Sequence, residues 1–291
     1  MAKHVFIFIP AFGNTLTTTT FLSVLQLQQV LASKAINTSV SALSFPDIAE
    51  LRSMAATIWY DTMPQCEYLL FIDSDMGFQP DLVLDMILFD HPIVGSIYPQ
   101  RRYPVSWAGS GNGGPTAERR GNFMKVEGVG MGCCLIRRDV MTTLMERMPK
   151  LIDNRISLHP AAGILQSVGA NRLIRAFEKL DLPERGIVSE DLSFCIRWNQ
   201  CGGETWAAIN YHISHVGMHD FGNNYMTFIT QQQSQQEQQA AIMANIQAGA
   251  APQLMGFDPS GKPILTMPLP APPPQQAVQV VPQMTVAQAA E

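Results

Sequence analysis

Two aspartates separated by one residue follow a short apolar run, and this spacing suits a hard divalent cation. Asp73 and Asp75 come directly after the run Tyr68–Ile72. A continuous apolar run of this length is typical of a strand buried on both faces of a parallel sheet. Ligands of open α/β sheets bind beyond the carboxyl ends of strands, where paired carboxylates can share Mg²⁺ or Mn²⁺. The spacing therefore indicates a cation site whose natural partner is a diphosphate, with an acidic pair on a solvated turn as the alternative.

The elements before this pair must position it at a sheet edge. Apolar runs and helical spacing predict a strand over 5–10, a helix over 17–34, a strand over 38–43 and a helix capped by Asp47 that leads into the strand at Tyr68. Strands that alternate with helices in this way form a parallel sheet covered by helices. The carboxyl ends of these strands then share one edge with the aspartates.

A second acidic pair stands at the expected start of a helix. Glu190 and Asp191 follow Ser189, and the helix should end before Cys201. Ser189 or Glu190 can cap this helix, and its apolar residues recur at helical spacing. Negative charge in the first turn is favoured by the helix dipole, so a purely structural capping role is the alternative to a catalytic one.

Glycines lie between the two acidic pairs at alternate positions. Gly128, Gly130 and Gly132 carry no side chain that would block one face, so a sugar ring or a loop could approach the backbone closely. A tight crossing within the sheet is the structural alternative. A strand over 133–136 and a helix over 140–148 capped by Asp139 are expected next.

Histidines follow the second acidic pair. His212, His215 and His219 fall within one short segment, so we expect at least one of them to be a metal ligand. Imidazole suits Mn²⁺ better than Mg²⁺, which favours manganese. The cysteines lack the paired spacing of a zinc site.

These motifs, taken together, resemble a known family. The strand that ends in Asp73 and Asp75, the upstream Arg52 and the later Glu190–Asp191 helix start are similar to the motifs of glycosyltransferases with the GT-A fold, in particular family-2-like enzymes. The resemblance covers about residues 4 to 220. It implies an α/β, Rossmann-like fold with a mostly parallel sheet flanked by helices, in a domain that we assign to residues 1–228.

The resemblance also implies roles for individual residues. In that superfamily the Asp-x-Asp pair holds the divalent ion that bridges the diphosphate of a nucleotide sugar. Carried over to this sequence, the implied metal ligands are Asp73, Asp75 and His215; the donor-binding residues are Pro10, Arg52, Asp73 and Asp75; the catalytic residues are Asp191 and Glu190; and the acceptor-binding residues are Gly130, Gly132 and Glu190.

The chemistry of glycosyl transfer explains these types of residue. A divalent ion stabilises the negative charge of the departing nucleoside diphosphate, and a carboxylate can take the proton of the attacking hydroxyl. In the similar inverting enzymes the base is the second acidic residue, here Asp191. If the anomeric configuration is retained, this base assignment fails and the metal assignment survives. Arg101 and Arg102 could touch the diphosphate or the acceptor, or be solvated loop arginines.

Composition indicates which partners and which cellular compartment such an enzyme would have. The chain of 291 residues has a formal net charge of -5 and no basic stripe. This argues against a protein whose main function is to bind the phosphates of double-stranded nucleic acid. No apolar run approaches the ~20 residues of a membrane span, and the sequence enters a strand without a signal peptide. Few and unpatterned cysteines favour the reducing cytoplasm.

The composition changes near residue 230. Residues 229–291 are rich in Gln, Ala and Pro, with a possible short helix over 240–246. Such sequence buries too little apolar area to offset its ordering entropy. We therefore expect a flexible, disordered tail that could tether the protein to a partner.

Two other functions compete with the glycosyltransferase. A sugar-phosphate nucleotidyltransferase should carry a Gly-rich loop with Arg and Lys after the first strand, and residues 10–15 lack it. A non-catalytic nucleotide-sugar-binding, glycan-binding or structural module could keep the fold. The sequence leaves open a UDP- or GDP-sugar as donor, and a glycan, lipid, protein or modified nucleobase as acceptor.

Overall fold

The computed structural model describes residues 3–102, 106–109, 117–217, 222–247, 253–257 and 263–266. Contacts divide the chain into two units, Met1–Phe228 and Ile229–Glu291, which are described separately.

An eight-stranded sheet forms the centre of the first unit, in the order β2-β1-β3-β10-β5-β15-β9-β8. Six of the eight strands point the same way. β1 is parallel to β2 and β3, β10 is antiparallel to both β3 and β5, and β15 is parallel to β5. β9 is antiparallel to β15 and β8 is antiparallel to β9, which returns β8 to the common direction. The strands are β1 (His4–Pro10), β2 (Asn37–Leu43), β3 (Tyr68–Ile72), β5 (Ile93–Ser96), β8 (Arg119–Arg120), β9 (Phe123–Val126), β10 (Cys133–Arg137) and β15 (Thr205–Ala208).

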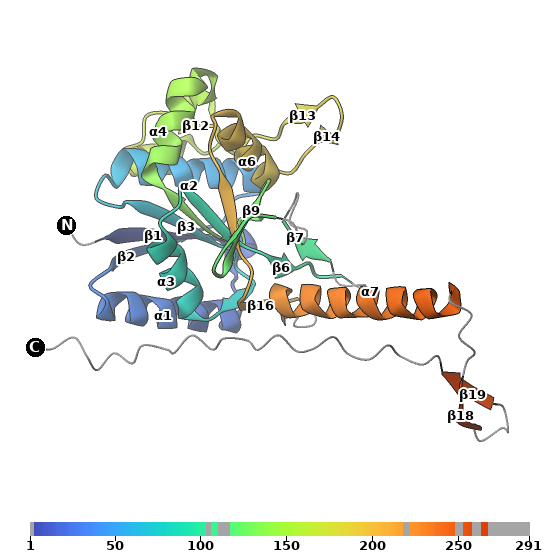
Figure 1. Ribbon diagram of the computed structural model, residues 1–291. Helices are drawn as coiled ribbons and strands as arrows, with labels where there is room; N and C mark the ends of the chain where they lie inside the picture. The colour runs from blue at the N-terminus through green and yellow to red at the C-terminus, as the bar shows by residue number, and fades with distance from the viewer. Residues whose placement is uncertain are drawn as a thin grey trace, which may run out of the picture. The chain divides into compact units, whose positions relative to one another are not determined.

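Helices cover both faces of this sheet (Figure 1). On one face, α1 (Thr18–Ser33) and α3 (Pro80–Phe89) pack against side chains such as Ile7 and Leu70. On the other, α2 (Ile48–Thr62), α4 (Arg138–Arg147) and α6 (Glu190–Gln200) pack against side chains such as Phe8 and Phe71. Successive residues of β1 and β3 thus enter opposite cores, which explains their continuous apolar sequences. The predicted α/β fold with a mostly parallel, helix-flanked sheet is confirmed.

Side-chain caps fix where the helices begin. The Asp47 carboxylate accepts a hydrogen bond of 3.0 Å from the Glu50 amide at the start of α2, as predicted. Ser189 caps α6 by accepting from the amide of Leu192. The prediction that Asp139 caps the next helix is wrong, because α4 begins at Arg138 and the Asp139 carboxylate pairs instead with Arg137 at 2.7 Å.

A small second sheet joins two segments that are distant in sequence. Its strands are β4 (Met76–Phe78), β16 (His212–His215) and β17 (Asn223–Asn224), in the order β17-β16-β4. His215 pairs with Met76 in an antiparallel register. This pairing brings the histidine segment beside the turn that holds Asp73 and Asp75.

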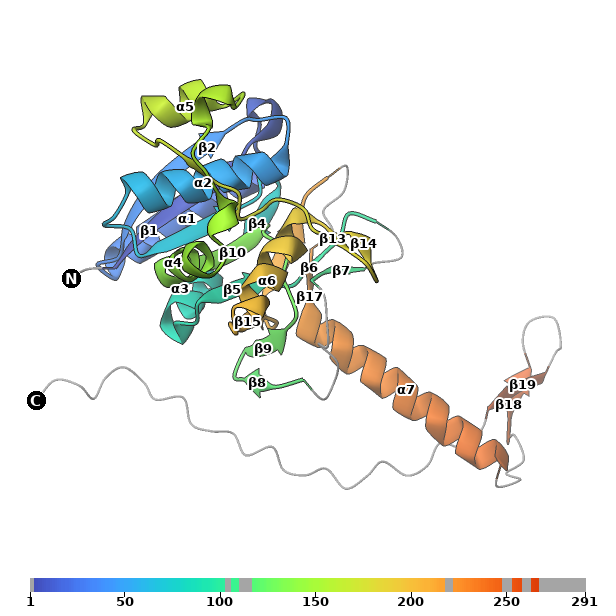
Figure 2. The same ribbon diagram turned by 90° about the horizontal axis from the view of Figure 1, so that it is seen from above.

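Shorter elements complete the first unit. The β13–β14 hairpin leads directly into the start of α6 (Figure 2). The elements are β6 (Tyr98–Pro99), β7 (Trp107–Ala108), β11 (Ile152–Asp153), α5 (Ala162–Ser167), β12 (Leu173–Ile174), β13 (Asp181–Leu182), β14 (Gly186–Ile187) and the 3-10 helices Phe12–Asn14, Pro149–Leu151 and Ile156–Leu158.

The C-terminal part of the chain, from Tyr225 on, holds more regular structure than the sequence suggested. The helix α7 runs over Tyr225–Gln247, so the expected short helix over 240–246 is wrong in its extent. Gln and Ala both favour helices, which accounts for the length. A hairpin of β18 (Gln253–Phe257) and β19 (Pro263–Thr266) follows. The predicted flexible tail otherwise falls on 248–252, 258–262 and 267–291, which lie outside the described residues. Within the part of the chain that the structure describes, none of the helices has the length and apolar character to span a bilayer.

The five cysteines should be chemically inert in the folded protein. All are free and buried, and burial raises the pKa of Cys133 to about 12 and that of Cys195 to about 11. Because the thiolate is the reactive form, an aromatic disulfide reagent at about pH 8 should label none of them before unfolding and all of them in guanidinium. Rapid labelling of any thiol in the native protein would contradict the buried positions.

Candidate active site

One buried arginine joins the two acidic pairs. Arg52 extends from α2 and is 3% exposed. Its Nη2 donates to Oδ1 of Asp73 at 2.9 Å, and its Nη1 donates to Oε1 of Glu190 at 3.0 Å and to Oδ1 of Asp191. The structure therefore brings together predicted donor-binding and catalytic residues that the sequence separates by more than a hundred positions.

The charges around Arg52 keep it ionised. Burial by itself would lower the pKa of the guanidinium, but the carboxylates of Asp73 and Glu190 outweigh burial and raise it. Three carboxylates thus surround one permanent cation. The excess negative charge makes this edge of the sheet receptive to a further cation or to a hydroxyl proton.

The second aspartate of the first pair faces a different set of partners. Asp75 Oδ2 lies 3.0 Å from Nη1 of Arg101 and 3.6 Å from Nε2 of His215. The β4–β16 pairing produces this contact, since the amide of Val216 also donates to the Asp75 carbonyl at 2.8 Å. Of the predicted metal ligands, Asp75 and His215 are neighbours, whereas Asp73 is turned toward Arg52.

A hydrogen bond at one ring nitrogen and a nearby carboxylate at the other orient His215. Nδ1 lies 2.9 Å from the carbonyl oxygen of Pro99, and Nε2 faces Asp75. Burial by itself would lower the pKa of His215, but these two partners outweigh it and raise the pKa. A carbonyl on one nitrogen is also the arrangement that leaves the other nitrogen of an imidazole to bind a metal.

Tyr98 fills the face that the glycines leave open. A Cβ added to Gly130 would lie 2.3 Å from the Tyr98 hydroxyl oxygen, and one added to Gly132 would lie 2.7 Å from it. The Gly132 amide donates to that oxygen at 3.2 Å, and the Gly132 carbonyl accepts from the Asp73 amide at 2.9 Å. The close approach is therefore made by this tyrosine, and an acceptor role for the two glycines stays a prediction.

Asp191 borders a cavity of about 330 Å³. Its Oδ2 accepts a hydrogen bond of 3.1 Å from the Met131 amide, which together with Arg52 fixes the carboxylate at the cavity wall. The other lining residues are Gln100, Ala108, Gly109, Gly128, Val129, Gly130, Ser189 and Leu192. A polar group on one wall of a small cavity is the arrangement expected of a site that orients a substrate.

The remaining predicted residues lie at the same sheet edge or outside the described chain. Phe8 pairs with Phe71 in the parallel register of β1 and β3, so Pro10 ends β1 level with Asp73. His219 lies outside the described residues. Among the residues that the structure does describe, no three His, Cys, Asp or Glu side chains are grouped so as to hold a metal ion.

Sequence reasoning missed Tyr98 and Gln100. Both follow β5, whose carboxyl end lies at the edge where Asp73 and Asp75 are found. That position was the available signal, because polar and aromatic residues just beyond a parallel strand face the ligand side of the sheet.

Comparisons with known proteins found similar structures but no similar sequences. No protein-family model and no curated protein matches the chain. Similar solved structures include A197 from STIV, with 14% identity, 74% of this chain and 86% of that chain covered and a TM-score of 0.41. Mannose-1-phosphate geranyltransferase from Thermus thermophilus has 14% identity, coverages of 57% and 65% and a TM-score of 0.35. A glycosyltransferase involved in the glycosylation of the major capsid of PBCV-1 has 12% identity, coverages of 56% and 74% and a TM-score of 0.29.

Removal of the Arg52 charge should destabilise the fold strongly. In Arg52→Met, three carboxylates lose their shared buried cation, which should lower the free energy of unfolding by about 3–5 kcal/mol. Urea denaturation followed by circular dichroism measures this loss. Arg185 pairs with Glu127 at 2.7 Å on the surface, so the control Arg185→Gln should cost no more than about 1 kcal/mol. Equal losses in the two variants would show that Arg52 is not the central ion pair.

Proposed function

We propose that this chain is a glycosyltransferase that moves a sugar from a nucleotide-diphosphate sugar to an acceptor hydroxyl. The observation that carries the proposal is the position of Asp191. Its carboxylate borders a cavity and is joined through Arg52 to Asp73, at the sheet edge where ligands of α/β folds bind. A candidate base and a candidate diphosphate site are thus held by one buried guanidinium.

The donor side would use Asp75 and His215 to hold a divalent cation, with Asp73 from the same turn. A site of carboxylate oxygens and an imidazole nitrogen suits Mn²⁺ better than Mg²⁺, because Mg²⁺ prefers oxygen ligands alone. Bound there, the cation would supply Lewis-acid stabilisation of the departing nucleoside diphosphate. Arg101 is half exposed, so its side chain is free to leave Asp75 and pair with a diphosphate.

The acceptor side would use Asp191 as general base in an inverting transfer. An ionised carboxylate offers about four acceptor positions, and Arg52 and the Met131 amide use one on each oxygen. Capacity therefore remains to take the proton of an acceptor hydroxyl in the cavity. Glu190, which shares Nη1 of Arg52 with Asp191, would position that guanidinium and the acceptor.

One observation favours the alternative of a binding module without transfer. Each of the four carboxylates already has a protein partner, namely Arg52 for Asp73, Glu190 and Asp191, and Arg101 for Asp75. Such a network could serve the fold alone. Catalysis requires in addition that Asp191 act on a substrate.

The proposal also includes the class of donor, the class of acceptor and the cellular location. We infer a UDP- or GDP-sugar as donor, and a reducing, cytoplasmic setting in which the five free thiols persist. The cavity beside Asp191 does not select among a glycan, lipid, protein or modified-nucleobase acceptor.

Nucleoside diphosphate release from a panel of nucleotide sugars, with Mn²⁺, with Mg²⁺ and with a chelator, tests the transfer. We expect release with one donor in the presence of metal, and a loss of about 10²–10⁴-fold in Asp191→Asn because the base is removed. Asp75→Ala should also lose release.

Asp139→Asn is the matched control, since Asp139 lies exposed in the first turn of α4 and pairs with Arg137 at the end of β10. It should leave the rate of release unchanged. Full activity in Asp191→Asn would reject Asp191 as the base, and nucleotide-sugar binding without any release would favour the binding module.

Manganese binding can be measured without turnover. Electron paramagnetic resonance of free Mn²⁺ should show a site whose affinity falls at least about tenfold in Asp75→Ala and in His215→Ala, because each removes a ligand. His212→Gln alters an exposed histidine at the other end of β16 and should bind Mn²⁺ like the wild type. An equal loss in His212→Gln, or no loss in His215→Ala, would contradict the assigned ligands.

A further inference from the structure

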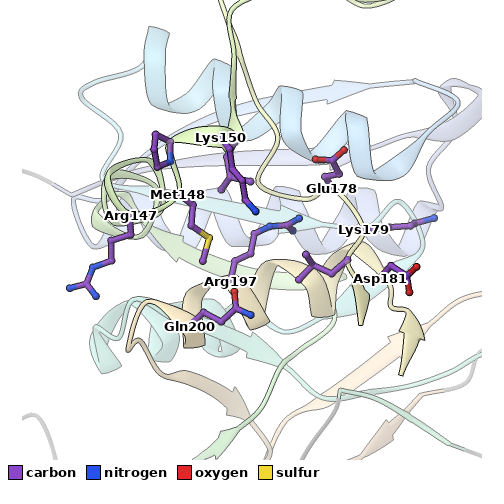
Figure 3. Close-up of a pocket in the computed structure, with 11 residues that line it drawn as sticks. Arg147, Met148, Lys150, Glu178, Lys179, Asp181, Arg197 and Gln200 are labelled. Atoms are coloured by element: carbon purple, nitrogen blue, oxygen red, sulfur yellow. The ribbon is translucent and has the colours of Figure 1, made fainter. Parts of the chain in front are cut away.

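A second cavity, of about 600 Å³, opens at the other end of α6 (Figure 3). The end of α4, the 3-10 helix Pro149–Leu151, the segment 178–181 and the last turns of α6 surround it. We call it the basic pocket, and its lining residues are Arg147, Met148, Pro149, Lys150, Leu151, Glu178, Lys179, Leu180, Asp181, Arg197 and Gln200.

Cations outnumber carboxylates in the basic pocket. Arg147, Lys150, Lys179 and Arg197 line it, against Glu178 and Asp181. In the described chain, none of these four cations has a carboxylate within 4.0 Å, whereas most other arginines are paired. The positive charge of the pocket is therefore left for a ligand to neutralise.

Arg197 is the buried centre of this charge. It is 5% exposed, and its Nη1 donates to the Ala176 carbonyl at 3.1 Å, the sole hydrogen bond of its side chain among the described residues. Figure 3 shows its guanidinium pointing into the pocket between Lys150 and Glu178. A guanidinium carries five N–H donors, so most of them lack a protein acceptor.

Partial loss of hydration makes this unpaired charge unfavourable. Loss of hydration lowers the pKa of Arg197, and the nearby Glu178 offsets this only in part. Buried charges are ordinarily paired or bound to a ligand, because an isolated ion loses its hydration without compensation. An oxyanion placed against Arg197 would restore the missing hydrogen bonds.

We propose that the basic pocket binds the phosphate group of a small phosphorylated ligand. The planar fork of Arg197 can hold two oxygens of one phosphate, and Lys150 and Lys179 can neutralise the remaining charge from the pocket mouth. The volume falls within the roughly 300–1,000 Å³ of small-molecule sites, which leaves room for more than an inorganic ion.

The basic pocket is separate from the proposed transfer site. Asp191 lies in the first turn of α6 and Arg197 six positions later, which is about 9 Å along a helix axis. The cavity beside Asp191 and the basic pocket have no lining residue in common. Phe194, halfway along α6, stacks on Phe177 with ring centroids 4.3 Å apart. Phosphate binding here therefore does not depend on glycosyl transfer.

Pyrophosphate binding to the full chain tests the proposal. Calorimetry at fixed ionic strength, with a chelator present to remove divalent cations, should give a measurable Kd for the wild type. In the double variant Lys150→Gln/Lys179→Gln that Kd should rise at least about tenfold. Both lysines are exposed, so the variant should fold, and the rise of Tm that pyrophosphate gives the wild type should disappear.

Two further variants locate the binding. Lys34→Gln removes an exposed lysine at the end of α1 and should bind pyrophosphate like the wild type. Arg101→Gln removes the cation at the proposed donor site and should also bind normally. Loss of binding in Arg101→Gln with retention in the double lysine variant would place the phosphate at the donor site and overturn the proposal. Equal weakening in Lys34→Gln, or no binding by the wild type up to roughly 10 mM, would also overturn it.

Discussion

A buried guanidinium needs anionic partners, and this requirement at Arg52 organises the candidate active site. Burial of the charge would be unfavourable without the carboxylates of Asp73, Glu190 and Asp191. To supply them, α2, the turn after β3 and the start of α6 must meet at one edge of the sheet. The ion-pair cluster therefore fixes the relative positions of three elements, and with them the cavity that Asp191 borders.

The pairing of two short strands is a second constraint on the sheet edge that holds Asp73 and Asp75. The pairing of β4 with β16 sets His215 beside Asp75, and the Pro99 carbonyl orients its ring. Tyr98, from the same short segment, packs on the glycines and accepts from the Gly132 amide. The loop after β5 thus supports both the candidate cation ligands and the backbone behind Asp73, which explains why bulkier residues than glycine would not fit there.

The helix α6 connects two regions of opposite charge. Its first turn holds Glu190 and Asp191 in the acidic cluster, and its last turns hold Arg197 in the basic pocket. Acidic residues at the beginning of a helix and basic residues near its end also complement the helix dipole. The same sequence features that stabilise α6 therefore give it two sites with different ligand chemistry, a proposed transfer site and a proposed phosphate site.

The sequence by itself determined the local structure: β3, the caps at Asp47 and Ser189, and the α/β class, because apolar periodicity and capping depend on neighbouring residues. It also named most of the candidate site, since polar residues beyond a strand are visible in the sequence. Only the tertiary structure decided that Arg52 joins both acidic pairs, that Tyr98 covers the glycines and that Arg197 lies unpaired in a pocket. These contacts depend on the order of the strands in the sheet, which local patterns do not encode.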